Sequence, residues 1–265
     1  DYAAYWIGQQ LGQFRPEYAL NSRPHAEMPN DFYRTALTIF YLMRDMKPGF
    51  VIADLVSKKA YKTILDLISK RPVITDKFPH IDFDRTWKAL NSKLLSPRPR
   101  DLCWRIAHHV LPVNSYLFHL HINRNALCPF CRWPETLTHR FFSCRAVRPL
   151  WKIVESWASA AAGFPITVSA DTVVFMQKTN TGENEDMLAI LISELNYAIW
   201  TQRNRLKYEK KNPNTADIKS LFEHFVRTRI LADHLRLDTD VFARLWCSGQ
   251  PPLATAVGQN VVVNI

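Results

Sequence analysis

The sequence predicts a mainly α-helical fold, and three observations support this prediction. Apolar residues recur at helical spacing through most of the 265 residues. The chain contains 16 prolines spaced along its length, and proline stops helices. Hydrophobic residues make up 47% of the chain and charged residues 22%, which is enough apolar material to bury a core. We therefore expect a helical bundle.

Five helices are expected in the first half of the chain, over residues 31–46, 57–70, 84–95, 101–110 and 115–121. In the first of these, Phe32, Ala36 and Ile39 lie three and four residues apart, which is the periodicity of one helix face. Ser57 is a suitable N-cap for the second. Residues 98–100, which read Arg-Pro-Arg, form either an extended segment that lies along a phosphate backbone or an ordinary proline-rich turn.

Three longer helices are expected in the second half, over residues 145–162, 186–211 and 215–236. The segment 186–211 begins with acidic residues and ends with basic ones, as the helix dipole favours. Residues 171–176 are predicted to form a short strand. Residues 261–263 are either disordered or part of another strand.

Several classes of protein are excluded. Glycine is scarce, at 7 residues, and the signatures GxGxxG and GxxxxGK[ST] are absent, which excludes the nucleotide-binding classes built on them. No apolar run reaches the roughly 18 residues of a membrane span, so we expect no membrane partner. Residues 1–14 lack the features of a secretory signal. Because no initiator methionine is present, we expect a piece of a longer protein.

The positive charge is concentrated in one stretch. Of the net charge of +10, residues 93–152 carry +8, from ten basic and two acidic residues. Eight of the ten basic residues are arginines, which bind phosphates in a bidentate way and stack on bases. This clustering predicts a polyanionic partner, because each neutralised phosphate releases counterions. A solvated basic face without a partner is the alternative interpretation.

One motif indicates specific chemistry: Cys128-x2-Cys131-x7-His139-x4-Cys144. Two thiolates separated by two residues can hold one metal ion from a tight turn, and His139 and Cys144 complete a tetrahedron. Three sulfurs and one imidazole favour Zn²⁺, and four filled positions indicate a structural site. An odd total of five cysteines, without a secretion signal, favours zinc over a disulfide. The metal core would carry a charge of about −1, so the arginines around it are expected to face outward.

The flanks of this motif carry further features. A Trp104-Arg105 … Leu111-Pro112 helix precedes it, a Glu-x3-His-x-Phe-x2-Cys pattern lies within it, and Leu150-Trp151 follows. Residues 198–204 read AIWTQRN, and residues 3–8 read AAYWIG. Together these features resemble the zinc-binding region C-terminal to the reverse transcriptase in non-LTR (LINE-type) retrotransposons. The stretch 3–8 is similar to the segment just after the polymerase thumb, so the resemblance spans most of the chain.

The resemblance implies the C-terminal domain of the element's second-reading-frame protein, a helical bundle with an embedded CCHC zinc knuckle. It implies a helical post-thumb linker at 1–95, a zinc-knuckle domain with a helical extension at 96–247 and a tail at 248–265. Its implied partners are template RNA and/or target DNA, held for target-primed reverse transcription, and the polymerase domain of the same protein. It also implies a nuclear protein with a cytoplasmic ribonucleoprotein stage.

The fragment itself is expected to be non-catalytic. The polymerase's paired aspartates are missing, since no Asp-Asp dipeptide occurs. The parent protein is expected to be a reverse transcriptase with an endonuclease. The predicted nucleic-acid contacts are basic residues near the knuckle and in the 186–211 helix: Arg98, Arg100, Arg105, Arg124, Arg132, Arg140, Arg145, Arg148, Lys152, Arg203 and Arg205. Phe130 and Trp133, inside the knuckle, either stack on bases or fill its small core.

Two other functions stay open. In the first, zinc only cross-links the chain of a scaffold module, and the basic face of this module binds an acidic protein or the polymerase. The second is a restriction-like endonuclease, for which the nearest acids are Asp171, Glu183, Glu185 and Asp186, with Lys178 nearby. The proline of the Pro-Asp motif is missing, however, and the acids at 183–186 are typical of a helix N-terminus.

Overall fold

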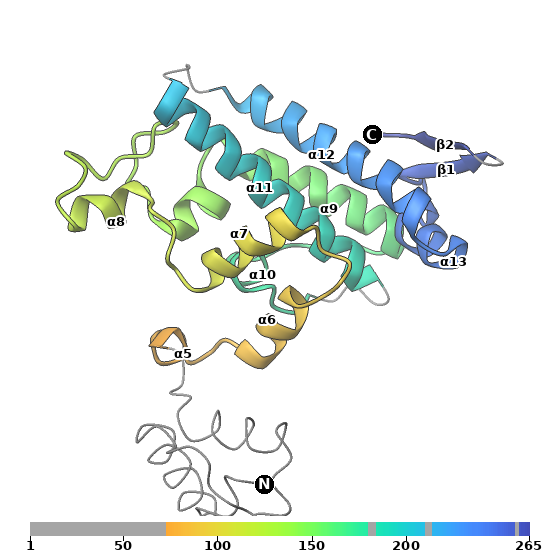
Figure 1. The fold of residues 1–265 in the computed structure, drawn as a ribbon, viewed down its shortest axis with the longest axis horizontal. Coiled ribbons are helices and arrows are strands. Elements are labelled where there is room, and N and C mark those ends of the chain that lie inside the picture. Colours follow the sequence, from red (N-terminus) through yellow and green to blue (C-terminus); the bar gives the residue numbers. More distant parts are fainter. Residues whose placement is uncertain (1–72, 180–183, 210–213, 258–259) are drawn as a thin grey trace, which may run out of the picture. The chain divides into compact units, whose positions relative to one another are not determined.

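The computed structural model describes residues 73–179, 184–209, 214–257 and 260–265 (Figure 1). Helices dominate this part of the chain, so the prediction of a mainly α fold is confirmed. The helices expected over 31–46 and 57–70 lie outside the described residues. Residues 73–265 form one compact unit. The predicted boundary between residues 95 and 96 falls inside that unit, and the assignment of residues 1–95 to a linker stays a prediction.

The described elements follow one another with short connections. In chain order they are α5 (Val73–Lys77), α6 (Phe83–Leu90), α7 (Pro97–Ala107), α8 (Asn114–His119), the π-helix η2 (His139–Ser143), α9 (Arg148–Ala162), α10 (Ala170–Phe175), α11 (Glu185–Glu209), α12 (Thr215–Arg236), α13 (Thr239–Phe242), the π-helix η4 (Ala243–Cys247), β1 (Ala254–Val257) and β2 (Asn260–Val263).

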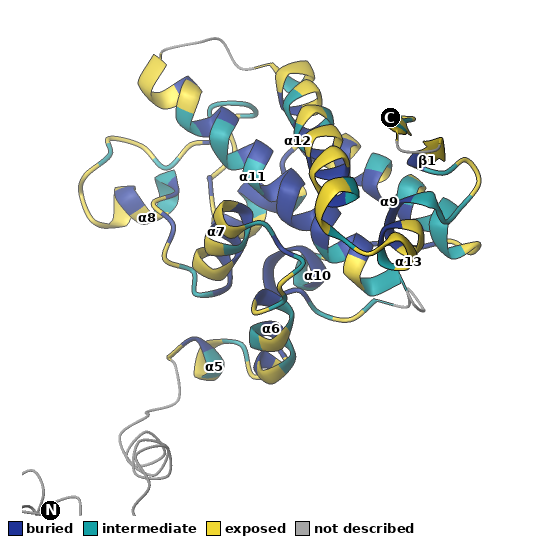
Figure 2. Ribbon diagram, turned by 45° about the vertical axis from the view of Figure 1, so that its right-hand side comes forward, coloured by how far each residue is buried: buried dark blue, intermediate teal, exposed yellow. Residues whose placement is uncertain are grey.

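Helix α11 is the central helix, and it packs against α7, α9 and α12 (Figure 1). Its Leu191, Leu195 and Ile199 are completely buried, and buried residues continue around most of its circumference (Figure 2). A helix that is apolar on most sides has to lie inside the protein. Among the described residues, no helix combines the length and the apolarity needed to cross a membrane.

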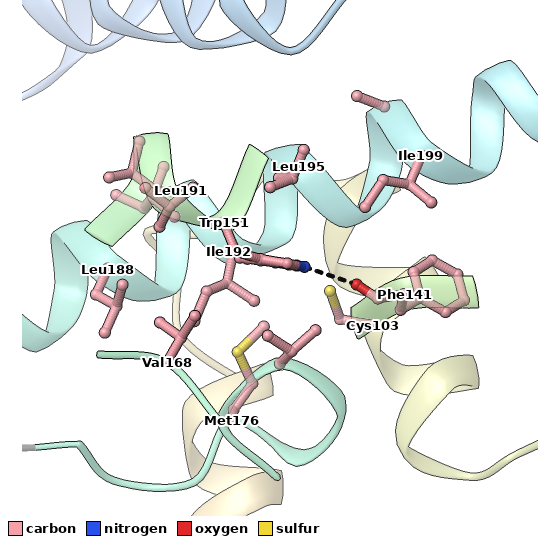
Figure 3. Close-up of a cluster of buried hydrophobic side chains, with 14 of the residues drawn as sticks. Cys103, Phe141, Trp151, Val168, Met176, Leu188, Leu191, Ile192, Leu195 and Ile199 are labelled. Carbon is pink, nitrogen blue, oxygen red and sulfur yellow. Dashed lines mark hydrogen bonds between the residues drawn. The ribbon is translucent and has the colours of Figure 1, made fainter. Parts of the chain in front are cut away.

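A hydrogen bond fastens the region of the cysteine motif to this core. The indole nitrogen of Trp151, on α9, donates to the carbonyl oxygen of Phe141, on η2, at 2.8 Å (Figure 3). Both side chains are buried beside α11. The C-terminal end of the motif is therefore anchored to the core by this hydrogen bond and by the apolar packing of the two side chains.

The start of α7 differs from the prediction. Pro97 occupies the first turn of the helix, where its missing N–H costs nothing and its fixed φ fits. Residues 98–100 are therefore helical, and Pro99 is buried. An extended strand of Arg-Pro-Arg along a phosphate backbone is thus wrong for this structure.

The strand predicted at 171–176 is instead helix α10. The Ser169 side chain accepts a hydrogen bond from the Thr172 backbone N–H and caps the helix. Val173 and Val174 are buried against the core, and α10 packs on α7. Capping and burial have overridden the strand propensity of β-branched residues.

The C-terminal residues form an antiparallel hairpin, in which Ala254 pairs with Val263 and Val257 with Asn260. Strand β1 contacts η4, and β2 contacts α12. Of the two interpretations of residues 261–263, the structure supports the strand.

Candidate metal centre

A tight hairpin presents the first two cysteines of the motif. Leu127 pairs with Pro134 across its base. The Cys128 backbone N–H donates to the Trp133 carbonyl at 2.7 Å, and the Arg132 N–H donates to the Cys128 carbonyl at 3.0 Å. Arg132 has a positive φ of 65°, a left-handed conformation that lets the chain turn back after Cys131. The hairpin therefore turns both thiols toward the same side.

The π-helix η2 presents the other two ligands. The Cys144 backbone N–H donates to the His139 carbonyl at 2.8 Å, a bond between residues five apart that widens the helix. The Thr136 hydroxyl accepts from the His139 backbone N–H at 3.1 Å and fixes the first turn. Phe141 is buried in the core and anchors the element. His139 and Cys144 are thus placed at opposite ends of one wide turn.

The four side chains converge on one point. The Cys128 and Cys144 sulfurs are 3.8 Å apart, as are those of Cys131 and Cys144, and Cys131 Sγ lies 3.1 Å from His139 Nε2. All four ligand atoms lie within 4.8 Å of one another. A tetrahedral zinc ion with Zn–S bonds of about 2.3 Å requires sulfurs about 3.8 Å apart. The separation fits zinc and is too long for a disulfide of about 2 Å.

Burial closes this centre. Cys128 and Cys144 are 0% exposed, whereas Cys131 and His139 are half-buried. Four protein ligands leave no position for a reacting water, so the donor set fits a structural Zn²⁺ held by Cys128, Cys131, His139 and Cys144. When bound, the ion cross-links the hairpin to η2. The predicted cofactor is confirmed.

A hydrogen bond joins the thiols of Cys128 and Cys144. The hydrogen bond with Cys144, together with burial, raises the pKa of Cys128 to about 12, and the same hydrogen bond lowers the pKa of Cys144. Zinc binds thiolates, so its binding has to release the proton held by Cys128. The affinity for zinc is therefore expected to fall as the pH falls.

Comparison with known proteins agrees with this centre. The family model described as "zinc-binding in reverse transcriptase" matches residues 57–151, which include all four ligands. The chain carries a reverse-transcriptase zinc-binding module. The chain is also 29% identical over 150 residues to the "Transposon TX1 uncharacterized 149 kDa protein" of Xenopus laevis, an alignment that covers 56% of this chain and 11% of that protein. The chain thus spans only a small part of that relative's length. No solved structure matches the chain significantly.

These findings confirm the predicted resemblance to reverse-transcriptase proteins of transposons. They also place the module in the part of the chain where the positive charge is concentrated.

Most of the predicted nucleic-acid contacts lie on the surface of the module or of α11. Arg100 is half-buried, and the following are exposed: Arg98, Arg105, Arg124, Arg132, Arg145, Arg148, Lys152 and Arg205. Two of these form ion pairs on their own helices, Arg105 with Asp101 at 2.8 Å and Lys152 with Glu155 at 2.6 Å. Their contact with nucleic acid stays a prediction.

Arg203 is a correction, because it is inside the protein. Its guanidinium is 2% exposed and pairs at 3.1 Å with Glu135, which is 0% exposed. It also donates to the Pro112 carbonyl and to Asn114 Oδ1, at 3.0 and 3.1 Å. Arg203 thus ties the segment before α8 and the end of the hairpin to α11. The sequence held one signal of this role, since Glu135 is the only acid between residues 102 and 152.

Arg140 is a second correction. We expected the arginines around the metal to face outward, but Arg140 is 0% exposed. Its Nη1 lies 3.8 Å from Cys128 Sγ, and its guanidinium lies 4.5 Å from the centre of the Phe130 ring. In this structure the guanidinium groups of Arg140 and Arg203 are therefore not on the surface.

The two aromatic residues of the knuckle have different environments. Phe130 is half-buried under Arg140 and packs against the core. Trp133 is 71% exposed. A hollow of about 250 Å³ is lined by Cys131, Trp133, His139, Ser143 and Arg145. The two aromatics therefore fit different interpretations. Phe130 fills the core, whereas Trp133 is available to a partner.

Two of the acids considered for an endonuclease, Asp171 and Glu185, are held in separate ion pairs. Asp171 lies 3.8 Å from His80, and Glu185 lies 2.8 Å from Arg85 and 4.0 Å from Lys178. Within the described residues, the cysteine–histidine cluster is the one group of three or more possible metal ligands. Glu183 lies outside them. No observation in the described part of the chain favours an endonuclease.

Proposed function

We propose that this module is a non-catalytic, nucleic-acid-binding part of a LINE-type reverse transcriptase protein, which positions template RNA or target DNA for target-primed reverse transcription. The observation that carries the proposal is the exposed Trp133 beside Arg132 and Arg145, on a hairpin fixed by the metal centre. In this role the protein acts in the nucleus, after a cytoplasmic ribonucleoprotein stage.

Trp133 is the most exposed of the described tryptophans, followed by Trp104 at 48%. Trp151 is 3% exposed and Trp246 is 0% exposed, because burying an indole is strongly favourable. An indole that is 71% exposed beside a hollow offers a flat face to an unpaired base. Stacking of a base on such a ring is worth about 1–3 kcal/mol and tolerates any sequence.

The position of Arg132 supports the same interpretation. A non-glycine residue in the left-handed region costs about 1–2 kcal/mol, and glycine would avoid this cost. Arg132 puts an exposed charge next to Trp133, where a phosphate would follow a stacked base.

The surrounding charge also supports a polyanionic partner. No acidic residue occurs from residue 102 to residue 134, a stretch that includes α8 and the hairpin. Each phosphate that an arginine neutralises releases counterions, so binding to this surface should weaken steeply with salt.

The test is the binding of labelled single-stranded RNA, single-stranded DNA and duplex DNA over a range of salt concentrations. Trp133→Ala should weaken binding to single strands by roughly 5- to 150-fold, from the lost stacking energy, and affect duplex DNA less. Arg132→Gln and Arg145→Gln should each reduce the salt slope on single strands by about 0.7. Arg244→Gln, at an exposed site on η4, is the matched control. An unchanged affinity and slope in all three variants would contradict the proposal.

A second function, docking on the polymerase domain, is favoured by a different observation. Four large hydrophobic residues on α8 and the turn after it are 46–67% exposed: Tyr116, Phe118, Leu120 and Ile122. Phe118→Ser with Ile122→Ser should weaken capture of the polymerase domain and leave RNA binding intact. Leu235→Ser, at a residue on α12 that is 87% exposed, is the control. Equal capture of the polymerase domain by all variants would contradict this second function.

A further inference from the structure

Arg140 is a buried cation without a carboxylate partner. It is 0% exposed, and none of the carboxylates in the described residues forms an ion pair with it. The nearest acid of the hairpin, Glu135, is taken by Arg203. Arginine stays charged at all ordinary pH values, and an uncompensated buried charge costs several kcal/mol. Some other negative group must therefore compensate Arg140.

The metal centre supplies that negative group. Three thiolates and one Zn²⁺ leave a net charge of about −1 on the centre. The Arg140 Nη1 is within 3.8 Å of Cys128 Sγ, and Cys128 is itself completely buried. The charge of the guanidinium and that of the zinc–thiolate centre therefore cancel inside the same low-dielectric region.

The guanidinium is also held in place on its other side. It lies 4.5 Å from the centre of the Phe130 ring, a cation–π distance that fixes its plane. Its Nε and Nη2 have no hydrogen-bond partner within the described residues. A side chain held only for packing would not leave two buried donors unsatisfied. Contact with the sulfur of Cys128 is the polar interaction that remains.

We propose that Arg140 is a positioning residue for the metal centre, whose buried positive charge compensates the net negative charge of the zinc–thiolate centre and so holds zinc tightly. Outer-shell groups of this kind typically contribute 10- to 100-fold in metal affinity. The contact of Arg140 Nη1 with Cys128 Sγ also holds that ligand in place. Arg140 therefore slows the release of zinc.

The experiment compares zinc retention in the full chain with Arg140→Gln, which removes the charge, and Arg140→Lys, which keeps it. Two quantities are measured: zinc affinity by competition with a chelator and the rate of zinc release under N-ethylmaleimide. Arg244→Gln, at an exposed residue on η4, is the control.

For Arg140→Gln we expect zinc affinity to fall 10- to 100-fold and release to accelerate. Arg140→Lys should retain most of the affinity, and Arg244→Gln should match the wild type. Wild-type values in Arg140→Gln, or equal losses in the Gln and Lys variants, would overturn the role of the charge. If Arg140→Gln does not fold, Arg140→citrulline keeps the shape and the donors while removing the charge, and the same outcomes apply.

Discussion

The core around α11 and the segment from residue 114 to residue 136, here called the knuckle lobe, are stabilised by different interactions. Leu191, Leu195 and Ile199 of α11 are fully buried among α7, α9 and α12. Within the knuckle lobe, the buried apolar side chains are those of Leu117 and Cys128. The core is held by apolar packing, whereas the lobe is held by a metal centre and a buried ion pair.

This difference shows how a surface can be both exposed and well positioned. A lobe with so little core of its own cannot fold on hydrophobic burial alone. Zinc and the Glu135–Arg203 pair replace that burial, which leaves its aromatic and basic side chains free to face solvent.

Loss of a zinc ligand should have the largest effect, and it should be confined to the lobe. Structural zinc contributes on the order of 10 kcal/mol to folding. In Cys128→Ser, hydrogen exchange should show lost protection of the lobe amides while the amides of α11 stay protected.

Cys247→Ser is the control for that experiment, because Cys247 is half-buried and lies outside the metal cluster. Its exchange pattern and zinc content should match the wild type. Equal loss of protection in α11 and in the lobe would show that the core depends on the metal centre as much as the lobe does.

Breaking the ion pair should have the next largest effect. Arg203→Met leaves the Glu135 carboxylate buried and unpaired, which should cost about 3–5 kcal/mol in unfolding by urea. Adding Glu135→Gln should recover part of that loss. Arg205→Met, at an exposed site on the same helix, should change stability by less than about 0.5 kcal/mol. Similar losses in the Arg203 and Arg205 variants would contradict the assigned role of the pair.

A rise in pH should lower the stability of the core, whereas a fall in pH should lower the zinc affinity of the knuckle lobe. Burial raises the pKa of Glu194, on α11, from 4.5 to about 7. The positive charge of Arg229 lowers this pKa, and the negative charge of Asp233 raises it, but burial is the largest cause. The folded state thus binds the proton more tightly, so this contribution to core stability is present below pH 4.5 and is lost as the pH rises through 7. The zinc affinity of the lobe should fall as the pH falls.

Glu194→Gln tests the part of this prediction that concerns the core. The variant should be more stable than the wild type at pH 8, by about 2–3 kcal/mol, and equally stable near pH 4.5. Asp186→Asn, at an exposed acid of the same helix, is the control. A Glu194→Gln difference that does not change with pH would rule out titration of Glu194 as its cause.

The smallest expected effect concerns the strained turn of the lobe. Arg132→Gly should raise the free energy of unfolding by roughly 0.5–1 kcal/mol, because glycine accepts the positive φ, while RNA binding weakens. Arg132→Ala removes the same charge and keeps the strain, so it should weaken binding without the gain in stability. Equal stability of the two variants would contradict strain at this position.

Much of the fold and the metal ligands could be predicted from the sequence, because local signals determine them. The helix at 215–236 has the predicted bounds, since Asn214 caps it and apolar residues repeat along it. The four metal ligands follow from their residue types and spacing.

The remaining features depend on tertiary contacts that a one-dimensional pattern does not contain. Val173 and Val174 favour a strand by type, but they lie in α10, whose cap and burial determine its structure. Counting charges correctly located the basic stretch and could not separate the exposed Arg145 from the buried Arg140 and Arg203. Segments that are distant in the sequence pack on a helix and determine which of its side chains are buried.

The most direct test of the account is the zinc content of the purified chain, measured by elemental analysis. The account predicts one zinc ion per chain, retained in Cys247→Ser and lost in Cys128→Ser. A wild-type chain that folds and protects the knuckle lobe without any bound metal would contradict it.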